Sequence, residues 1–318
     1  MKSPATPGRQ KTVLILLGLL IGSATAEIYC RFVRPHNAYR DVSHFLTSQA
    51  YCVDPDLGYR PRMGPGFEYT TAGTLTNALP LARRPGFQRV LFVGDSVTAR
   101  ATLVRPLSAN LTTGTTNVHE VFNAGVEGYD FWQITQYFLT YNQSVAPDHV
   151  IYTLHNNDLF FLLPVVSFDT GNAIIFGPPN GPHEIRLPPL LGRSDIWRRL
   201  AIRRWKHAEV RARTAAFRDD LEHFHRTLSA DGIELSIVLF PVLKPLDQWT
   251  DEERRSRSAS LAALAALKIR YVDVWPALER AIDDGTVLSE TPGDIWHPSE
   301  ELARQFVLEI QSSGILNR

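Results

Sequence analysis

From residue 87 to the C-terminus, short hydrophobic runs typical of buried strands alternate with longer stretches whose apolar positions recur at helical spacing. The hydrophobic runs are residues 90–93, 118–122, 149–154, 235–240 and 269–274. The helical stretches are residues 97–103, 131–141, 196–213, 215–228, 251–267 and 298–312. Strands that alternate with helices in this way predict a parallel sheet between two helical layers. We therefore expect a three-layer α/β/α domain with a five-stranded parallel sheet over residues 86–318.

An uncharged apolar run, TVLILLGLLIGSATA, occupies residues 12–26. Three basic residues precede it: Lys2, Arg9 and Lys11. This order of charge and apolar residues predicts export, with the basic side left in the cytoplasm. Ala24 and Ala26 would permit cleavage before Glu27, so residues 1–26 are predicted to be either a signal anchor or a signal peptide. The run is short for a spanning helix, and a buried core helix is a third interpretation, less favoured.

Two segments lack a clear periodic pattern. Residues 27–85 are rich in Pro, Gly, Thr and Arg, as in DPDLGYRPRMGPG at residues 54–66. This composition predicts an extended stalk or wrap with little regular structure. Residues 160–192 contain apolar clusters interrupted by GPPNGP and no convincing helix or strand pair. A segment of this length suits a substrate-facing lid or insertion, which we place at residues 159–193.

Composition narrows the class of protein. The chain has 318 residues, of which 44% are hydrophobic, enough to bury a full core. Lys plus Arg and Asp plus Glu both number 33, so the net charge of zero gives no general reason to expect a nucleic-acid partner. The two cysteines, Cys30 and Cys52, exclude a cysteine-based zinc site and a CxxC redox motif. In an oxidising compartment these two thiols could pair.

The end of the first predicted strand carries a candidate nucleophile. Asp95 and Ser96 follow Gly94 at the carboxyl edge of the expected sheet, where open α/β folds place their ligands. The same two residue types are also ordinary helix N-caps, and these positions alone leave both interpretations open. A nucleophilic serine further requires a base, a carboxylate that orients the base, and donors for an oxyanion.

A DxxH sequence near the C-terminus can supply the base and its carboxylate. Asp294 precedes His297 by three residues, and Pro298 follows at the first predicted helical position. A turn of this kind brings the carboxylate to one ring nitrogen and leaves the other free to accept a proton. Because surface Asp and His pairs are common, this spacing is weak evidence when taken alone.

Taken together, these motifs resemble the SGNH (GDSL) hydrolase family, whose four sequence blocks occur in order between residue 87 and the C-terminus. The matching positions are Gly94-Asp95-Ser96 for the first block, Gly128 for the second, Asn157 for the third, and Asp294 with His297 for the last. The resemblance implies the flavodoxin-like SGNH hydrolase fold.

The resemblance also implies the roles of individual residues. Ser96 would be the nucleophile, His297 the base and Asp294 the carboxylate that orients the base. The backbone N–H groups of Ser96 and Gly128 and the side-chain amide of Asn157 would form the oxyanion hole. Serine chemistry of this type needs no metal or other cofactor. Asp130, Asp158 and Asp169 could suggest a metal site, but no pair among these three has a convincing ligand spacing.

Two positions depart from the family pattern. His155 stands where the third block usually opens with glycine, and its side chain would narrow the site or add a hydrogen-bonding group. Arg100 stands where glycine is often found. One helical turn after Ser96, it could meet an anionic substrate or form an ion pair with Asp95. We therefore regard Arg100 and His155 as candidate substrate contacts.

These observations predict an esterase that is anchored in a membrane and acts outside the cytoplasm, or is secreted if the N-terminal segment is cleaved. The apolar run, followed by Glu27–Arg31 and then by DPDLGYRP (residues 54–61), is similar to bacterial membrane-anchored SGNH proteins. The expected substrate is a small acyl ester or an acylated glycan with acetyl or short acyl groups. An O-acyltransferase that modifies a surface polysaccharide would use the same residues, and a non-catalytic carbohydrate-binding or assembly module would keep the fold alone. The natural substrate and the oligomeric state stay open.

Overall fold

The computed structural model describes residues 7–30, 39–75, 82–100, 102–113, 119–160, 162–169, 172–177, 181–187 and 192–316. A five-stranded parallel sheet forms the centre of the main domain, in the order β11-β10-β6-β4-β5. Its strands are β4 (Gln88–Gly94), β5 (His119–Asn123), β6 (His149–His155), β10 (Glu234–Phe240) and β11 (Arg270–Asp273). The predicted five-stranded parallel sheet is confirmed. Val118, the predicted start of the second strand, lies outside the described residues.

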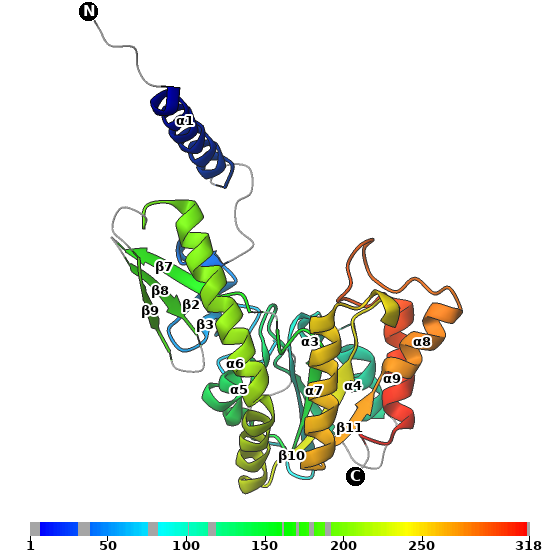
Figure 1. Cartoon of the computed structure of the whole chain (residues 1–318). Coiled ribbons are helices and arrows are strands. Elements are labelled where there is room, and N and C mark those ends of the chain that lie inside the picture. Colours follow the sequence, from blue (N-terminus) through cyan, green and yellow to red (C-terminus); the bar gives the residue numbers. More distant parts are fainter. Residues whose placement is uncertain are drawn as a thin grey trace, which may run out of the picture.

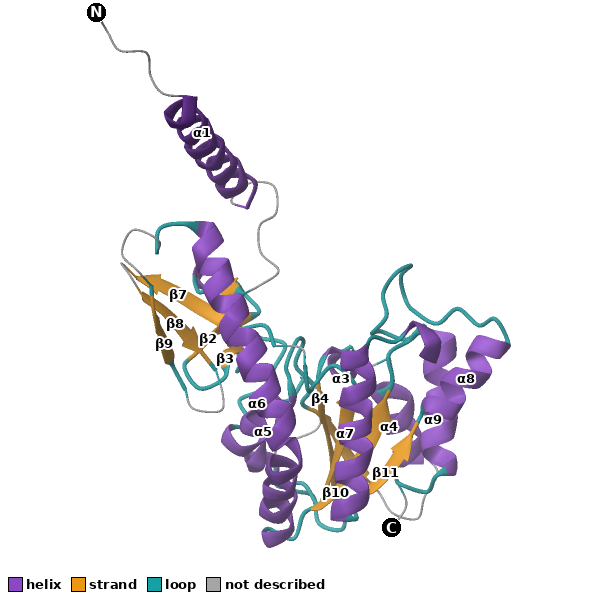
Figure 2. Ribbon diagram, viewed as in Figure 1, coloured by secondary structure: helices purple, strands orange, loops and turns teal. Residues whose placement is uncertain are grey.

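Strand β4 lies between β6 and β5, and its successive side chains point to opposite faces of the sheet, both of which are buried. Leu91 and Val93 pack in one core cluster together with residues of helices α5, α6 and α7. Val90 and Phe92 pack in a second cluster together with residues of α4, α8 and α9. Helices therefore cover both faces of the sheet, which gives the predicted three layers (Figure 2).

The helices of the main domain differ in detail from the prediction. They are α3 (Ser96–Ala99), α4 (Val104–Thr113), α5 (Phe131–Thr140), α6 (Asp195–Ala230), α7 (Asp251–Leu267), α8 (Trp275–Asp283) and α9 (Glu300–Ser312), with 3-10 turns η2 (Asn142–Val145) and η3 (Leu246–Gln248). The two helices expected over residues 196–228 are one helix of 36 residues. The helix expected from Pro298 begins at Glu300, because the Ser299 hydroxyl accepts the N–H of Leu302 and caps it.

A smaller sheet with the order β1-β7-β8-β9 lies beside the main domain (Figure 1). Its strands are β1 (Arg40–Asp41), β7 (Val165–Asp169), β8 (Asn172–Phe176) and β9 (His183–Arg186); α2 (Ser43–Leu46) and the hairpin of β2 (Tyr51–Asp54) with β3 (Gly58–Pro61) lie nearby in sequence. The predictions of little regular structure in residues 27–85 and of no strand pair in residues 160–192 were therefore wrong. These strands have two to five residues each. A run of this length has too few alternating apolar and polar positions to be recognised in a sequence rich in Pro and Gly.

Helix α6 joins the smaller sheet to the main domain. Its residue Ile202 packs in the cluster of the smaller sheet, together with Val166 and Ile175. Further along the helix, Phe217 and Leu221 pack in the core of the main domain. The smaller sheet is thus attached to the main domain through a continuous helix (Figure 1).

The N-terminal helix α1 (Pro7–Ile28) extends away from the rest of the chain (Figure 1). Residues 10–28 have a mean hydropathy of 1.7 and none of this stretch is buried, so it is not a core helix. Its length and composition fit a membrane-spanning helix and equally a signal sequence. At its C-terminal end, the Glu27 carboxylate accepts the N–H of Asp195 at 2.7 Å and thereby contacts the start of α6.

Candidate active site

Ser96 stands at the junction between β4 and α3. Asp95 is the N-cap of α3, and its carboxylate accepts the N–H of Val97 at 2.9 Å. A side chain at Gly94 would collide with the hydroxyl groups of Thr98 and Thr153, so only glycine fits between the strand and the helix. The helix N-cap expected in this stretch is therefore Asp95, and Ser96 is the first residue of the helix.

The structure brings Ser96, His297 and Asp294 together in one chain of hydrogen bonds. Nε2 of His297 lies 2.8 Å from Oγ of Ser96. Nδ1 of the same ring lies 2.7 Å from Oδ2 of Asp294. Ser96 and His297 are 201 positions apart in the sequence, so this contact depends on the tertiary fold.

The Asp294 carboxylate is held by its own loop. Its second oxygen, Oδ1, accepts the N–H groups of Trp296 at 2.8 Å and of His297 at 3.2 Å. Partial burial acts to raise the pKa of Asp294, but these two hydrogen bonds and the one from the His297 ring outweigh it and hold the pKa below its usual value. Asp294 is therefore ionised at neutral pH and fixes the ring with Nε2 facing Ser96.

The loops after β5 and β6 flank Ser96, because both strands pair with β4. Gly94 is in register with Thr153 of β6, and Phe92 is in register with Asn123 of β5. The loop after β5 is tied directly to the strand end by a 3.0 Å hydrogen bond from Val126 N–H to the Gly94 carbonyl. The topology thus places the loops that carry Gly128 and Asn157 on either side of the candidate nucleophile.

Two backbone donors at this edge have no acceptor within the part of the chain that the structure describes: the N–H groups of Ser96 and Gly128. Gly128 has φ +75°, a conformation that favours glycine. Asn157 is 9% exposed, and its own backbone N–H donates to Nδ1 of His155 at 3.3 Å. Ser96, Gly128 and Asn157 therefore come from the three adjacent strand ends that an oxyanion hole would need.

Comparison with solved structures identifies the fold. The chain is similar to a catalytic mutant of Axe2, an acetylxylan esterase from Geobacillus stearothermophilus, with 12% identity over 73% of this chain and 96% of that chain and a TM-score of 0.50. TesA matches with 16% identity over 71% and 98% of the two chains and a TM-score of 0.45. LAE5, an alpha/beta hydrolase enzyme from the metagenome of Lake Arreo, Spain, matches with 11% identity over 75% and 100% and a TM-score of 0.49.

The main domain has an SGNH hydrolase fold. The fold predicted from the four sequence blocks is thereby confirmed. No protein-family model matches this sequence, and no curated protein does.

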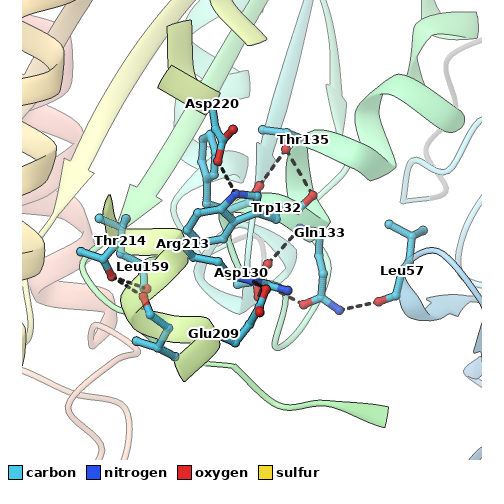
Figure 3. A network of polar contacts seen from close by, with 12 residues as sticks. Leu57, Asp130, Trp132, Gln133, Thr135, Leu159, Glu209, Arg213, Thr214 and Asp220 are labelled. Atoms are coloured by element: carbon cyan, nitrogen blue, oxygen red, sulfur yellow. Dashed lines mark hydrogen bonds and ion pairs between the residues drawn. The ribbon is translucent and has the colours of Figure 1, made fainter. Parts of the chain in front are cut away.

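A buried ion pair fixes the loop after β5 to α6 (Figure 3). Asp130 caps α5 through a capping box with Gln133. Arg213 of α6 donates to Asp130 Oδ2 and to Glu209 Oε1, both at 2.8 Å. Burial raises the pKa of Asp130, although the Arg213 guanidinium and the N–H groups of α5 partly offset this effect. No sequence pattern predicts this pair, because its two members are 83 positions apart.

His155 does not occupy the position expected of a substrate contact. It is 1% exposed, and its ring lies parallel to Phe240 with 6.4 Å between centroids and edge-on to Trp296 at 5.4 Å. Its Nδ1 accepts the N–H of Asn157. Burial lowers the pKa of His155, so the ring is neutral at neutral pH. The His155 side chain therefore supports the loop after β6 and does not line an open pocket.

Arg100 also differs from the prediction in its partners. It forms ion pairs with Glu290 at 2.9 Å and with Glu127 at 3.6 Å, and none with Asp95. Asp95 is buried at the start of α3, where its carboxylate caps the helix. Because α3 ends at Ala99, Arg100 turns toward the loop that leads to His297. Its predicted contact with an anionic substrate stays a prediction.

The described parts of the chain contain neither a candidate metal site nor a disulfide. No group of three His, Cys, Asp or Glu side chains among the residues placed by the structure could hold a metal ion. Cys30 and Cys52 are both free thiols. The thiol of Cys52 lies 3.8 Å from the carbonyl oxygen of Arg60.

Proposed function

We propose that this chain is a serine esterase that hydrolyses carboxylic esters through Ser96. The observation that carries the proposal is the position of the His297 ring, with Nε2 2.8 Å from Ser96 Oγ and Nδ1 2.7 Å from Asp294. A hydroxyl, a base and an orienting carboxylate in this order are the requirements for an activated serine nucleophile.

In the first half of the reaction, Ser96 Oγ attacks the ester carbonyl carbon while Nε2 of His297 takes the hydroxyl proton. The carbonyl oxygen becomes negatively charged and accepts hydrogen bonds from the N–H groups of Ser96 and Gly128 and from the Asn157 amide. One such donor is worth about 3 kcal/mol of barrier. The bond to the alcohol then breaks, and the alcohol leaves with the proton from His297.

In the second half, water gives a proton to His297 and attacks the acyl group on Ser96. The second tetrahedral intermediate collapses, the acid leaves, and Ser96 recovers its proton from His297. Asp294 stays ionised throughout and stabilises the imidazolium, because its pKa lies below the usual value. If a sugar hydroxyl takes the place of water, the same residues transfer the acyl group to a glycan.

The proposed substrates are acetyl or short acyl esters, including acylated glycans. The likeness to a structure described as an acetylxylan esterase supports this class. We further propose that residues 1–26 anchor the chain, or direct its secretion if they are cleaved. In this arrangement residues 27–85 and the SGNH domain of residues 86–318, with its insertion at 159–193, lie outside the cytoplasm. The exposed apolar helix α1 and the three basic residues before residue 12 support it.

Labelling with a fluorophosphonate tests the nucleophile. We expect the full-length protein, purified in mild detergent, to be labelled and to hydrolyse acetyl esters, whereas Ser96→Ala does neither. An unlabelled wild type, or equal labelling of Ser96→Ala, would contradict the proposal. Hydrolysis that is slow until an oligosaccharide acceptor is added would identify a transferase. Intact cellular function of Ser96→Ala would identify a non-catalytic module.

A further inference from the structure

The peptide bond between Glu127 and Gly128 carries both a fixed carbonyl and the free N–H of the candidate oxyanion hole. The hydroxyl of Tyr59 donates to the Glu127 carbonyl oxygen at 2.6 Å. Because a trans peptide is planar, its C=O and N–H point in opposite directions and turn together. A hydrogen bond that fixes the Glu127 carbonyl therefore also fixes the direction of the Gly128 N–H. Polarisation through the peptide should in addition make that N–H a stronger donor.

Tyr59 is itself held rigidly in the N-terminal segment. It lies on β3, and its side chain is fully buried. Its ring contacts Phe45 at 5.5 Å and Tyr129 at 5.2 Å between centroids, and the Arg40 guanidinium lies 5.2 Å from its centroid. The Tyr129 hydroxyl donates to the Tyr59 carbonyl at 2.6 Å. The phenol is thus a preorganised donor, and burial raises its pKa so that it keeps its proton.

The close approach of Tyr59 to Gly128 accounts for the glycine. A Cβ atom at Gly128 would lie 2.9 Å from the Tyr59 hydroxyl oxygen. Any larger residue would displace the hydroxyl from the Glu127 carbonyl or strain the backbone, which has φ +75°. The hydrogen bond from Tyr59 to Glu127 therefore requires glycine at position 128.

A second tyrosine provides a matched comparison. The hydroxyl of Tyr69 donates to the Gly125 carbonyl at 2.7 Å, in the same loop and from the same segment. The N–H on the other side of that peptide belongs to Val126 and already donates to the Gly94 carbonyl at 3.0 Å. Loss of the Tyr69 hydroxyl would remove a similar buried hydrogen bond. The peptide that it loosens carries no candidate oxyanion donor.

We propose that Tyr59 is a positioning residue that aims the Gly128 N–H at the oxyanion, so that residues of the segment before the SGNH domain complete the active site. The inference rests on the proposed esterase function. Tyr59 thereby gives a positioning role to a segment whose sequence predicted only a stalk or wrap.

The test compares Tyr59→Phe with Tyr69→Phe in the full-length protein in detergent, since both keep the packed ring and lose one hydroxyl. The readouts are kcat and KM for p-nitrophenyl acetate, inhibition by phenylboronic acid as a tetrahedral analogue, and the thermal unfolding midpoint. For Tyr59→Phe we expect kcat to fall about 10-fold or more, KM to change little, and the inhibitor to bind more weakly by a similar factor. Tyr69→Phe should lose comparable stability and keep kcat within about 2-fold, because it touches no oxyanion donor.

A third variant, Tyr129→Phe, keeps the inference testable if Tyr59→Phe does not fold. It keeps the Tyr59 hydroxyl but removes the hydrogen bond that the Tyr129 hydroxyl donates to the Tyr59 carbonyl. We expect the kcat of Tyr129→Phe to lie between the kcat values of Tyr59→Phe and Tyr69→Phe. Equal kcat values for Tyr59→Phe and Tyr69→Phe, with active wild type, would overturn the inference alone. A wild type that is neither labelled nor hydrolytic would overturn the proposed function and the inference with it.

Discussion

The Arg213 guanidinium lies 2.8 Å from the Asp130 carboxylate, and both side chains are almost completely buried. Removal of the cation alone would leave a carboxylate without its charged partner in the core. We therefore expect Arg213→Leu to lower the free energy of unfolding by about 3–5 kcal/mol. Urea denaturation of the detergent-purified chain measures this loss.

Arg218 on the same helix serves as the control for this experiment. Its ion pair with Asp219 is exposed, with 64% and 72% of the two side chains accessible to solvent. Arg218→Leu should cost less than about 1 kcal/mol, because exposed pairs are screened by water. Equal losses for the two variants would show that the buried pair contributes no more than a surface pair.

The parts of the site that could be predicted from sequence are those with a local signature. The strand before Ser96 is a run of apolar residues, and the three-residue spacing of Asp294 and His297 closes within a single turn. Tyr59 and Arg213 carry no such signature. Tyr59 is 68 positions from Glu127, and its hydroxyl finds that carbonyl only after the hairpin has packed on the domain.

The position of His155 shows a related limit of sequence patterns. A histidine at the end of a strand predicts a group facing the ligand, because the carboxyl ends of parallel strands form the site. Here the ring turns inward, since Phe240 and Trp296 offer it a packing surface. Which way one side chain points at a strand end depends on neighbours from other strands, and these are not adjacent in sequence.

Replacement of Asp294 tests the orientation of the base. In Asp294→Asn, the amide would favour the wrong His297 tautomer, and we expect kcat to fall about 10⁴-fold. KM should change little, and fluorophosphonate labelling should slow with kcat. Asp283→Asn, an exposed position at the end of α8, is the control and should behave as wild type. Near-normal kcat in Asp294→Asn would contradict the orienting role.

Burial of neutral His155 predicts a specific pH dependence of stability. Its pKa is lowered in the folded chain, so the unfolded chain binds more protons as the pH falls below the usual histidine pKa of about 6.5. The stability that this residue contributes is complete above that pH and is lost as the pH falls through the window between the two pKa values. His155→Gln can still accept the Asn157 N–H but cannot titrate there. Its unfolding free energy should therefore fall less than that of wild type between pH 7.5 and 5.5.

His119 is the internal comparison for this measurement. Burial also lowers the pKa of His119, which lies on β5 and is present in both proteins. It therefore adds the same slope to wild type and to His155→Gln, and the difference between the two curves belongs to His155. Parallel curves would show that His155 titrates in the folded chain as it does in the unfolded chain.

The close approach of Gly125 to α3 predicts that the smallest added side chain disturbs the nucleophile. A Cβ atom at Gly125 would lie 2.7 Å from the carbonyl carbon of Thr98 and closer still to the N–H of Ala99. These are backbone atoms of the helix that begins at Ser96, so they cannot rotate aside as a side chain would. We expect Gly125→Ala to cost about 1–3 kcal/mol of stability and to lower kcat, because relief of the overlap must shift α3 or the loop.

Gly22 gives the contrasting substitution. It lies in α1, where an added Cβ meets no atom within 4 Å, and alanine favours a helix over glycine. Gly22→Ala should leave kcat for p-nitrophenyl acetate unchanged. Thermal unfolding and kcat measured side by side then separate the two positions. Wild-type kcat and stability in Gly125→Ala would show that α3 and the loop after β5 are not packed backbone to backbone.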